Sequence, residues 1–164
     1  MTIAQSLLSE LKHEAGVTRK MLERIPFDRL SWKPHEKSMS LLDLTEHLVG
    51  LPLWIDRTIS PDDFDLLTIS KDSSVHTSPA DLIAEYDNNI KKAEAVLAVC
   101  DDEFSKTWSL RRGDIVFFTL PKAVAVRNLA MNHLVHHRGQ LSVYLRLLDV
   151  PVPGAYGPSA DDTL

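Results

Sequence analysis

NHLVHHRGQL, residues 132–141, contains three of the chain's seven histidines within a run that has the periodicity of one long helix. An α-helix turns about 100° per residue, so His133 and His137 lie on one face, one turn apart. With His133 at zero, Tyr144 falls at about 20° and His137 at about 40°, within the apolar stripe. His136 falls at about 300°, at the rim of that stripe. The spacing of His133 and His137 is the one by which a helix offers two imidazoles to one metal ion.

A third histidine lies on the apolar face of a helix predicted over residues 40–59. With His47 at zero, Leu51 falls near about 40°, so the imidazole shares the buried face of this helix. Asp43, one turn earlier, is interpreted either as a favourable charge at the helix start or as a hydrogen-bond acceptor that orients His47. Pro52 predicts a kink, because its ring removes a donor and collides with the preceding turn.

Four segments have apolar residues at helical spacing and predict amphipathic helices. They cover residues 3–24, 40–59, 79–99 and 121–148. Polar segments without a sustained period, including residues 60–77, are predicted to be loops. Before the last helix, two apolar runs flank Arg111-Arg112-Gly113-Asp114, which predicts a short hairpin or an extended flap. The fold class predicted is therefore all-α, a four-helix bundle that forms a single domain over residues 1–164.

Composition and charge exclude several classes of protein. The 164 residues are 44% hydrophobic and 25% charged, as is usual for a globular chain. The formal net charge is −5 and the Lys and Arg residues are scattered, which argues against a nucleic-acid partner. The one cysteine, Cys100, excludes an internal disulfide. We find no secretory signal and no apolar run of the roughly 18 residues that a membrane span needs, so we expect a cytoplasmic protein.

Several other polar residues are assigned to structural positions. His35 and His76 lie in polar loops and are predicted to be solvent-exposed. Arg138 and Arg146 fall opposite the apolar stripe, which predicts surface or dimer contacts. Cys100, at the end of the third helix, is interpreted as a small packing residue.

Three residues near the histidines have open interpretations. Gln140, near about 340° on the wheel of the last helix, is a candidate contact to a histidine or to substrate. The Tyr144 hydroxyl either serves the site or satisfies a local hydrogen bond. Trp32 is predicted to pack onto the helices instead of stacking on a ligand.

His47, His133 and His137 together predict a metal site with three neutral nitrogen ligands. Three protein ligands and one open position are typical of a catalytic divalent-metal site, whereas structural zinc sites usually have four protein ligands. Nitrogen ligands suit Zn, Ni, Fe or Cu more than Mg or Ca, and zinc is the first choice by availability. A water or thiol bound to such an ion loses its proton more easily and becomes a nucleophile near neutral pH.

The chain resembles the DinB/YfiT-like superfamily in four features. They are the spacing His47…His133-x3-His137, the run HHRGQL at 136–141, WKPH at 32–35, and the tail YGPSAD at 156–161. The resemblance covers nearly the whole chain, and the tail matches the DinB branch. It implies an up-down-down-up helix bundle that holds a divalent metal at these three histidines and often forms homodimers.

The resemblance also implies a class of activity, because characterised members of that superfamily include a mycothiol-dependent maleylpyruvate isomerase and bacillithiol S-transferases. The leading hypothesis is a metal-dependent enzyme that activates a low-molecular-weight thiol for transfer to a small electrophilic substrate. Metal-assisted hydrolysis is an alternative within the enzyme class. The competing class is a non-catalytic metal-binding or stress-response interaction protein. The simplest alternative is a helical domain whose histidines are core residues and bind no metal.

Overall fold

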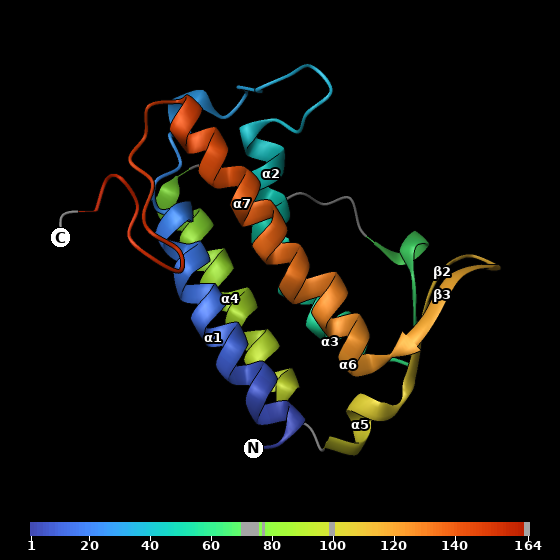
Figure 1. Cartoon of the computed structure of the whole chain (residues 1–164). Coiled ribbons are helices and arrows are strands. Elements are labelled where there is room, and N and C mark those ends of the chain that lie inside the picture. The colour runs from blue at the N-terminus through green and yellow to red at the C-terminus, as the bar shows by residue number, and fades with distance from the viewer. Residues whose placement is uncertain (70–75, 77, 99–100, 163–164) are drawn as a thin grey trace.

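The computed structural model describes residues 1–69, 76, 78–98 and 101–162. Most of this part of the chain is helical, and a small sheet extends from one end of the helices (Figure 1). The predicted role of Cys100 lies outside the described residues. The prediction of an all-α bundle is therefore confirmed in its mostly helical character and corrected by the presence of β-structure.

The helices follow one another in an order close to that predicted. They are α1 (Ile3–Leu22), α2 (Leu41–Gly50), α3 (Leu53–Ile59), α4 (Pro79–Leu97), α5 (Asp101–Ser105), α6 (Lys122–Val126) and α7 (Asn132–Leu147). Short 3₁₀ turns, η1 (Phe27–Arg29) and η2 (Leu66–Thr68), lie between them, and a π-helical segment, η3 (Arg127–Met131), joins α6 to α7. The helix α5 was not predicted.

The long helices pack side by side around one apolar core. The helix α1 and the α6–α7 segment run in one direction, and α2–α3 and α4 run in the opposite one (Figure 1). Contacts join α1 to α4 and α7, and α2 to α4 and α7. Fully buried leucines of several elements, such as Leu22, Leu48 and Leu141, belong to the shared core. This packing places α2 and α7, the two helices that carry the histidines, in direct contact.

Local sequence signals set the helix starts. The Thr2 hydroxyl accepts from the Gln5 amide at the start of α1, and Ser78 caps α4 beside Pro79. At the start of α2, Ser40 and Asp43 form a reciprocal capping box, in which the Asp43 carboxylate accepts from the Ser40 hydroxyl at 2.6 Å. Asp43 thus serves the helix start, the first of its two predicted roles.

Two predicted helices are interrupted. Leu51 and Pro52 separate α2 from α3, as the proline predicted. The helix predicted over residues 121–148 is not continuous, because η3 widens it for about one turn just before His133. There the amide of Asn132 donates to the carbonyl of Arg127, five residues back. The apolar residues before and after η3 keep a helical spacing in the sequence, so the sequence pattern alone did not reveal this segment.

The sheet combines a predicted hairpin with a strand that was predicted as loop. The strands β2 (Thr107–Arg112) and β3 (Ile115–Pro121) pair antiparallel around a turn in which Gly113 has a φ of 58°. The strand β1 (Asp63–Asp65) pairs parallel with β2, so the loop predicted over residues 60–77 is wrong in this part. A three-residue strand depends on its distant partner, which its own sequence does not reveal.

Two predicted exposures are also wrong. The Arg138 side chain is only 2% exposed and forms an ion pair with Glu14 of α1 at 2.5 Å. His76 has a side chain that is 5% exposed, with its Nε2 3.0 Å from a carboxylate oxygen of Glu85. Each of these side chains is buried by a partner on another element. The predictions rested on position along the helix and on the polarity of the loop, which do not reveal such a partner. Arg146 lies at the surface, as predicted, paired with Asp161 of the tail.

A membrane-spanning helix is absent from the described residues, since none of the helices there combines the necessary length with the necessary apolar character.

Candidate metal centre

Three imidazoles from two helices meet where α2 faces α7. His47 lies in α2, and His133 and His137 lie one turn apart in α7. The Nε2 atom of His133 is 3.3 Å from that of His47 and 2.9 Å from that of His137. One nitrogen from each residue lies within 4.8 Å of the others, and all three residues are half-buried. The structure therefore brings together the three residues that the sequence proposed as ligands.

The outer ring nitrogens of the α7 histidines face oxygen acceptors. His133 Nδ1 lies 3.4 Å from the carbonyl oxygen of Leu129, and His137 Nδ1 lies 2.7 Å from Oε1 of Gln140. Because neither oxygen carries a proton, each Nδ1 carries the proton and donates. In the neutral rings, the Nε2 atoms of His133 and His137 then present two lone pairs to each other at 2.9 Å. Such a pair repels unless a proton or a cation is shared between the rings.

The spacing of the nitrogens fits a transition-metal ion. Zinc binds imidazole nitrogen at about 2.0–2.1 Å, so two nitrogens at a tetrahedral angle are about 3.3–3.4 Å apart. The Nε2 separations of 3.3 Å and 2.9 Å lie at or slightly below that value. Imidazole is also the ligand type that Zn, Ni and Fe accept readily. The imidazole donors and the two separations that involve His133 are thus consistent with one divalent ion.

Burial keeps the three imidazoles in the form that can bind a metal. Desolvation, together with the smaller effect of charge on His137 and His133, lowers the pKa of His47 from its ordinary value of 6.5 to about 4. Desolvation also lowers the pKa values of His133 and His137, although their hydrogen bonds to Leu129 and Gln140 act in the opposite direction. Neutral rings at neutral pH leave the Nε2 lone pairs free for coordination.

The neighbouring polar residues divide between the site and the surrounding structure. Gln140 contacts the site, since its Oε1 accepts from His137 while its amide donates to Nε2 of the exposed His136 at 3.1 Å. The Tyr144 hydroxyl instead donates to the carbonyl of Met39 at 3.1 Å, the local hydrogen bond that was its other interpretation. The ring of Trp32 packs against that of Tyr144, with centroids 5.4 Å apart, as a core contact.

The two histidines predicted in loops, His35 and His76, are not part of this centre. His35 is exposed, as predicted, and its Nδ1 accepts from the amide of Lys37. His76 lies between Glu46 of α2 and Glu85 of α4, with ring nitrogens 3.8 Å and 3.0 Å from their carboxylates. Within the described residues, the three-histidine cluster is the one group of His, Cys, Asp and Glu side chains with metal-ligand spacing.

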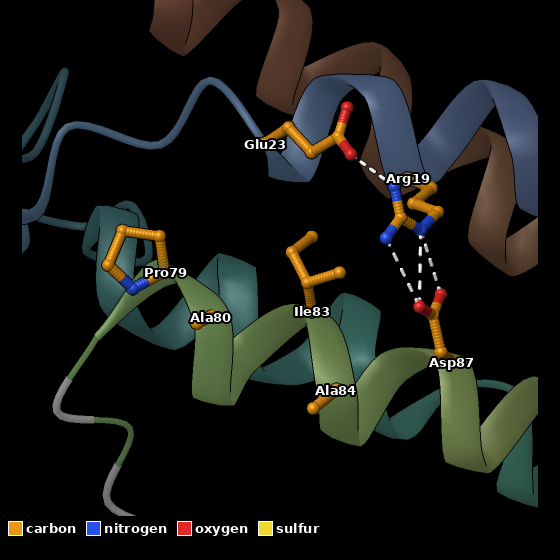
Figure 2. Close-up of a pocket in the computed structure, with 7 residues that line it drawn as sticks. All are labelled: Arg19, Glu23, Pro79, Ala80, Ile83, Ala84 and Asp87. Atoms are coloured by element: carbon orange, nitrogen blue, oxygen red, sulfur yellow. Dashed lines mark hydrogen bonds and ion pairs between the residues drawn. The ribbon is translucent and has the colours of Figure 1, made fainter.

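A cavity of about 470 Å³ lies apart from the histidines, between α1 and the beginning of α4 (Figure 2). Its charged groups face one another: Arg19 hydrogen-bonds to Asp87 at 2.9 Å and also contacts Glu23. Apolar side chains, including Ile83, form much of the remaining lining. Because the charges satisfy each other, this cavity offers no reactive group comparable to the histidine cluster.

Sequence reasoning missed the backbone acceptor that orients His133. Leu129 lies four residues before His133, inside η3, and its carbonyl oxygen is 3.4 Å from His133 Nδ1. The position i−4 is the only local signal for this contact, and every helical residue has such a neighbour. The structure was needed to distinguish it.

Comparison with known proteins points to one family. The model of the DinB family matches residues 1–163. A search of curated proteins found no match.

Solved structures share the fold over most of the chain. A DinB-like protein from Bacillus subtilis is 23% identical, with a TM-score of 0.68, covering 89% of this chain and 96% of its own. One from Bacillus cereus ATCC 10987 is 24% identical, with a TM-score of 0.70 and coverages of 94% and 95%. A proposed DinB member from Exiguobacterium sibiricum 255-15 is 20% identical, with a TM-score of 0.70 and coverages of 98% and 97%. At these identities the similarity shows the fold.

Proposed function

The chain belongs to the DinB family, and on that premise we propose that it binds a divalent transition-metal ion through His47, His133 and His137. The observation that carries the proposal is the convergence of three Nε2 atoms, two of them with the opposite nitrogen hydrogen-bonded outward. Zinc is the first choice of ion, and nickel or iron would suit the same ligands.

The residues of the site have distinct roles in this proposal. Gln140 and the carbonyl of Leu129 fix the rings of His137 and His133 so that each directs Nε2 inward. The neutral ring of His47 approaches from the facing helix. A bound ion would supply an acidified water or thiol near neutral pH. Since the described residues offer three nitrogens here, one position of a tetrahedral ion would remain for an exogenous ligand.

We propose that the protein is a metal-dependent enzyme that activates a low-molecular-weight thiol for S-transfer to a small electrophilic molecule. The three-ligand donor set supports this, together with the resemblance to thiol-dependent members of the superfamily. A metal-dependent hydrolase would use the same centre with water in place of the thiol. Neither reaction requires nucleic acid or a membrane.

We infer that residues 1–164 form a single domain. This domain is an up-down-down-up four-helix bundle, in which α2–α3 and α6–α7 each count as one interrupted helix. The contacts of α1 and α2 with both α4 and α7 support this arrangement. The superfamily resemblance supports a homodimer, and the single cysteine supports a cytoplasmic location.

A non-catalytic metal-binding protein is the second candidate. It is favoured by one observation: the ligands come from α2 and α7, so an ion would tie two helices together. The two candidates differ at the remaining coordination position. Exchangeable water there, with turnover of a thiol and an electrophile, supports the enzyme, whereas inertness in every assay supports the structural role.

Elemental analysis of the as-isolated protein tests the metal site. We expect about one equivalent of a transition metal in the wild type and a nearly complete loss in His133→Ala, with the helical circular dichroism largely kept. His136→Ala is the matched control, because His136 lies beside the site without facing it, and it should keep its metal. Equal metal content in the wild type and His133→Ala would refute the assignment.

The reaction is tested separately, with the metal-loaded protein. A panel of bacillithiol, mycothiol, glutathione and coenzyme A, each with a chromogenic electrophile, should show turnover with at least one thiol. Turnover should disappear in His133→Ala and persist in His136→Ala. A metal-containing protein that is inert with every thiol would contradict the transferase proposal and leave the metal site standing.

A further inference from the structure

Buried cationic side chains are paired with carboxylates throughout the described residues, with one exception. Five Lys or Arg residues there are buried or half-buried, and four of them form ion pairs. The pairs are Arg19–Asp87, Arg111–Asp65, Lys122–Glu103 and Arg138–Glu14. The fifth is Arg57 of α3, whose guanidinium has no hydrogen-bond or ion-pair partner in the described part of the chain. An unpaired charge that has lost part of its water is costly unless a ligand supplies the opposite charge.

Aromatic side chains hold Arg57 in position. Its Cζ lies 5.2 Å from the ring centroid of Trp54 and 5.4 Å from that of Phe64. The two rings pack edge to face, and the Trp108 indole donates to the Arg57 carbonyl at 2.9 Å. Burial lowers the pKa of the guanidinium and the charge of Asp56, the preceding residue, acts in the opposite direction, so Arg57 remains a cation. Contact with the rings limits its motion, and its N–H donors have no acceptor among the described residues.

This aromatic cluster is linked to the metal centre through Leu129. Trp54 and Arg57 lie on α3, which follows the His47 helix α2 after the break at Leu51 and Pro52. Trp54, Phe64 and Leu129 all pack against the same apolar cluster around Trp108. The carbonyl of Leu129 is the acceptor for His133. Leu129 thus contacts His133 of the histidine cluster and also packs against the apolar cluster around Trp108. Trp54 and Phe64, the rings beside Arg57, pack against that same apolar cluster.

We propose that Arg57, held by Trp54 and Phe64, binds the carboxylate of a small organic substrate whose reacting part lies at the histidine centre. This proposal rests on the proposed function, and it assigns the substrate of that function to the small carboxylates. A guanidinium matches a carboxylate through two parallel N–H···O bonds, and the neighbouring rings suit an apolar body. The one positive charge of Arg57 balances a monoanion, whereas a phosphate dianion would keep an uncompensated negative charge beside a chain whose net charge is −5.

Binding of benzoate to the metal-free protein at pH 8 tests the proposal, because the histidines are then neutral and no metal can bind the carboxylate. Saturation-transfer NMR should show binding of benzoate at least tenfold tighter than that of benzamide, its neutral analogue. Arg57→Gln should remove this preference. Arg57→Lys keeps the positive charge and loses the two parallel N–H donors of the guanidinium, so it should retain part of the preference for benzoate. Arg24→Gln, which alters an exposed arginine of the α1–η1 connection, should match the wild type.

Equal affinity of the wild type for benzoate and benzamide would overturn the proposal, whatever the variants show. An unchanged benzoate preference in folded Arg57→Gln would overturn it as well. Acetate should displace benzoate more effectively than inorganic phosphate does at equal concentration, and the reverse order would overturn the assignment to a carboxylate. Because these measurements are made without metal, their failure is distinguishable from failure of the metal site.

Discussion

At the scale of single residues, the candidate centre depends on which nitrogen of each imidazole carries the proton. Leu129 and Gln140 lie on the same helical segment as His133 and His137, four residues before the first and three after the second. Both contacts are therefore made within one stretch of backbone, before any distant residue is involved. Once Nδ1 donates to these oxygens, Nε2 is the only nitrogen left for a ligand. Orientation of the two rings is a local property of the α6–α7 segment.

Replacing Gln140 tests the orienting role directly. Gln140→Met keeps the length of the side chain and removes the acceptor for His137, so we expect metal affinity to fall by about 10–100-fold. Competition with a chromophoric chelator measures this affinity. Gln140→Glu keeps an acceptor at the same place and should bind at least as tightly as the wild type.

His136→Ala is the matched control for that measurement. It removes the other partner of the Gln140 side chain and leaves the contact to His137 in place. Its metal affinity should equal that of the wild type. A Gln140→Met protein that binds metal as tightly as the wild type would show that Gln140 does not orient the ligand.

At the scale of elements, α7 is held from two sides. One face presents His133 and His137 to α2, and another presents Arg138 to α1. The Arg138 guanidinium pairs with Glu14 at 2.5 Å and contacts the Tyr156 hydroxyl of the C-terminal tail, which itself donates to Glu14. This buried group fixes the rotation of α7 relative to α1. The same rotation determines where the histidines point.

Breaking the Arg138–Glu14 pair should be strongly destabilising. Arg138→Met leaves the Glu14 carboxylate, which is 11% exposed in its side chain, without its cation. We expect the free energy of unfolding to fall by about 3–5 kcal/mol, as measured by urea denaturation. The double variant Glu14→Gln/Arg138→Met removes both charges and should recover a large part of that loss.

Arg146→Met is the control at the same helix. Arg146 also pairs with an acidic residue, Asp161, but its side chain is 50% exposed. Solvent screens this pair, so its loss should change the free energy of unfolding by no more than about 1 kcal/mol. Equal effects of Arg138→Met and Arg146→Met would contradict the role assigned to the buried pair.

At the scale of the whole molecule, folding collects three imidazoles that the unfolded chain keeps apart. His47 and His133 are 86 positions apart in sequence, and their Nε2 atoms come within 3.3 Å. Burial makes the charged forms of these rings unfavourable in the folded state alone, because the unfolded chain leaves each histidine in water. Stability of the metal-free protein must then depend on pH.

The sign of this dependence follows from the pKa values. Below about pH 6.5 the unfolded chain protonates His47, whereas the folded protein, with a pKa of about 4 for this residue, does not. The unfolded state therefore binds more protons, and the free energy of unfolding should fall as the pH is lowered from 6.5 towards 4. His133 and His137, whose pKa values are also lowered, add to the effect.

Urea denaturation of the metal-free protein at a series of pH values measures this effect. His47→Gln should have a shallower pH profile than the wild type between pH 6.5 and 4. His35→Gln, which alters an exposed histidine, should have the wild-type profile. Identical profiles for His47→Gln and the wild type would contradict the attribution to this centre.

The sequence by itself determined what depends on neighbours along the chain. The periods of the apolar residues predicted the long helices, and Pro52 predicted the kink at which α2 and α3 are separated. The four-residue spacing of His133 and His137 placed both on one face. Each of these follows from backbone geometry over a turn or two, which needs no tertiary contact.

Only the tertiary structure decided what depends on distant partners. The strand β1 exists because β2 pairs with it, and Arg138 is buried because Glu14 neutralises it from another helix. The approach of His47 to the α7 histidines has the same cause, since it depends on how α2 packs against α7. These pairings are stabilised by contacts between residues far apart in the chain. The local periodicity of the sequence therefore does not predict them.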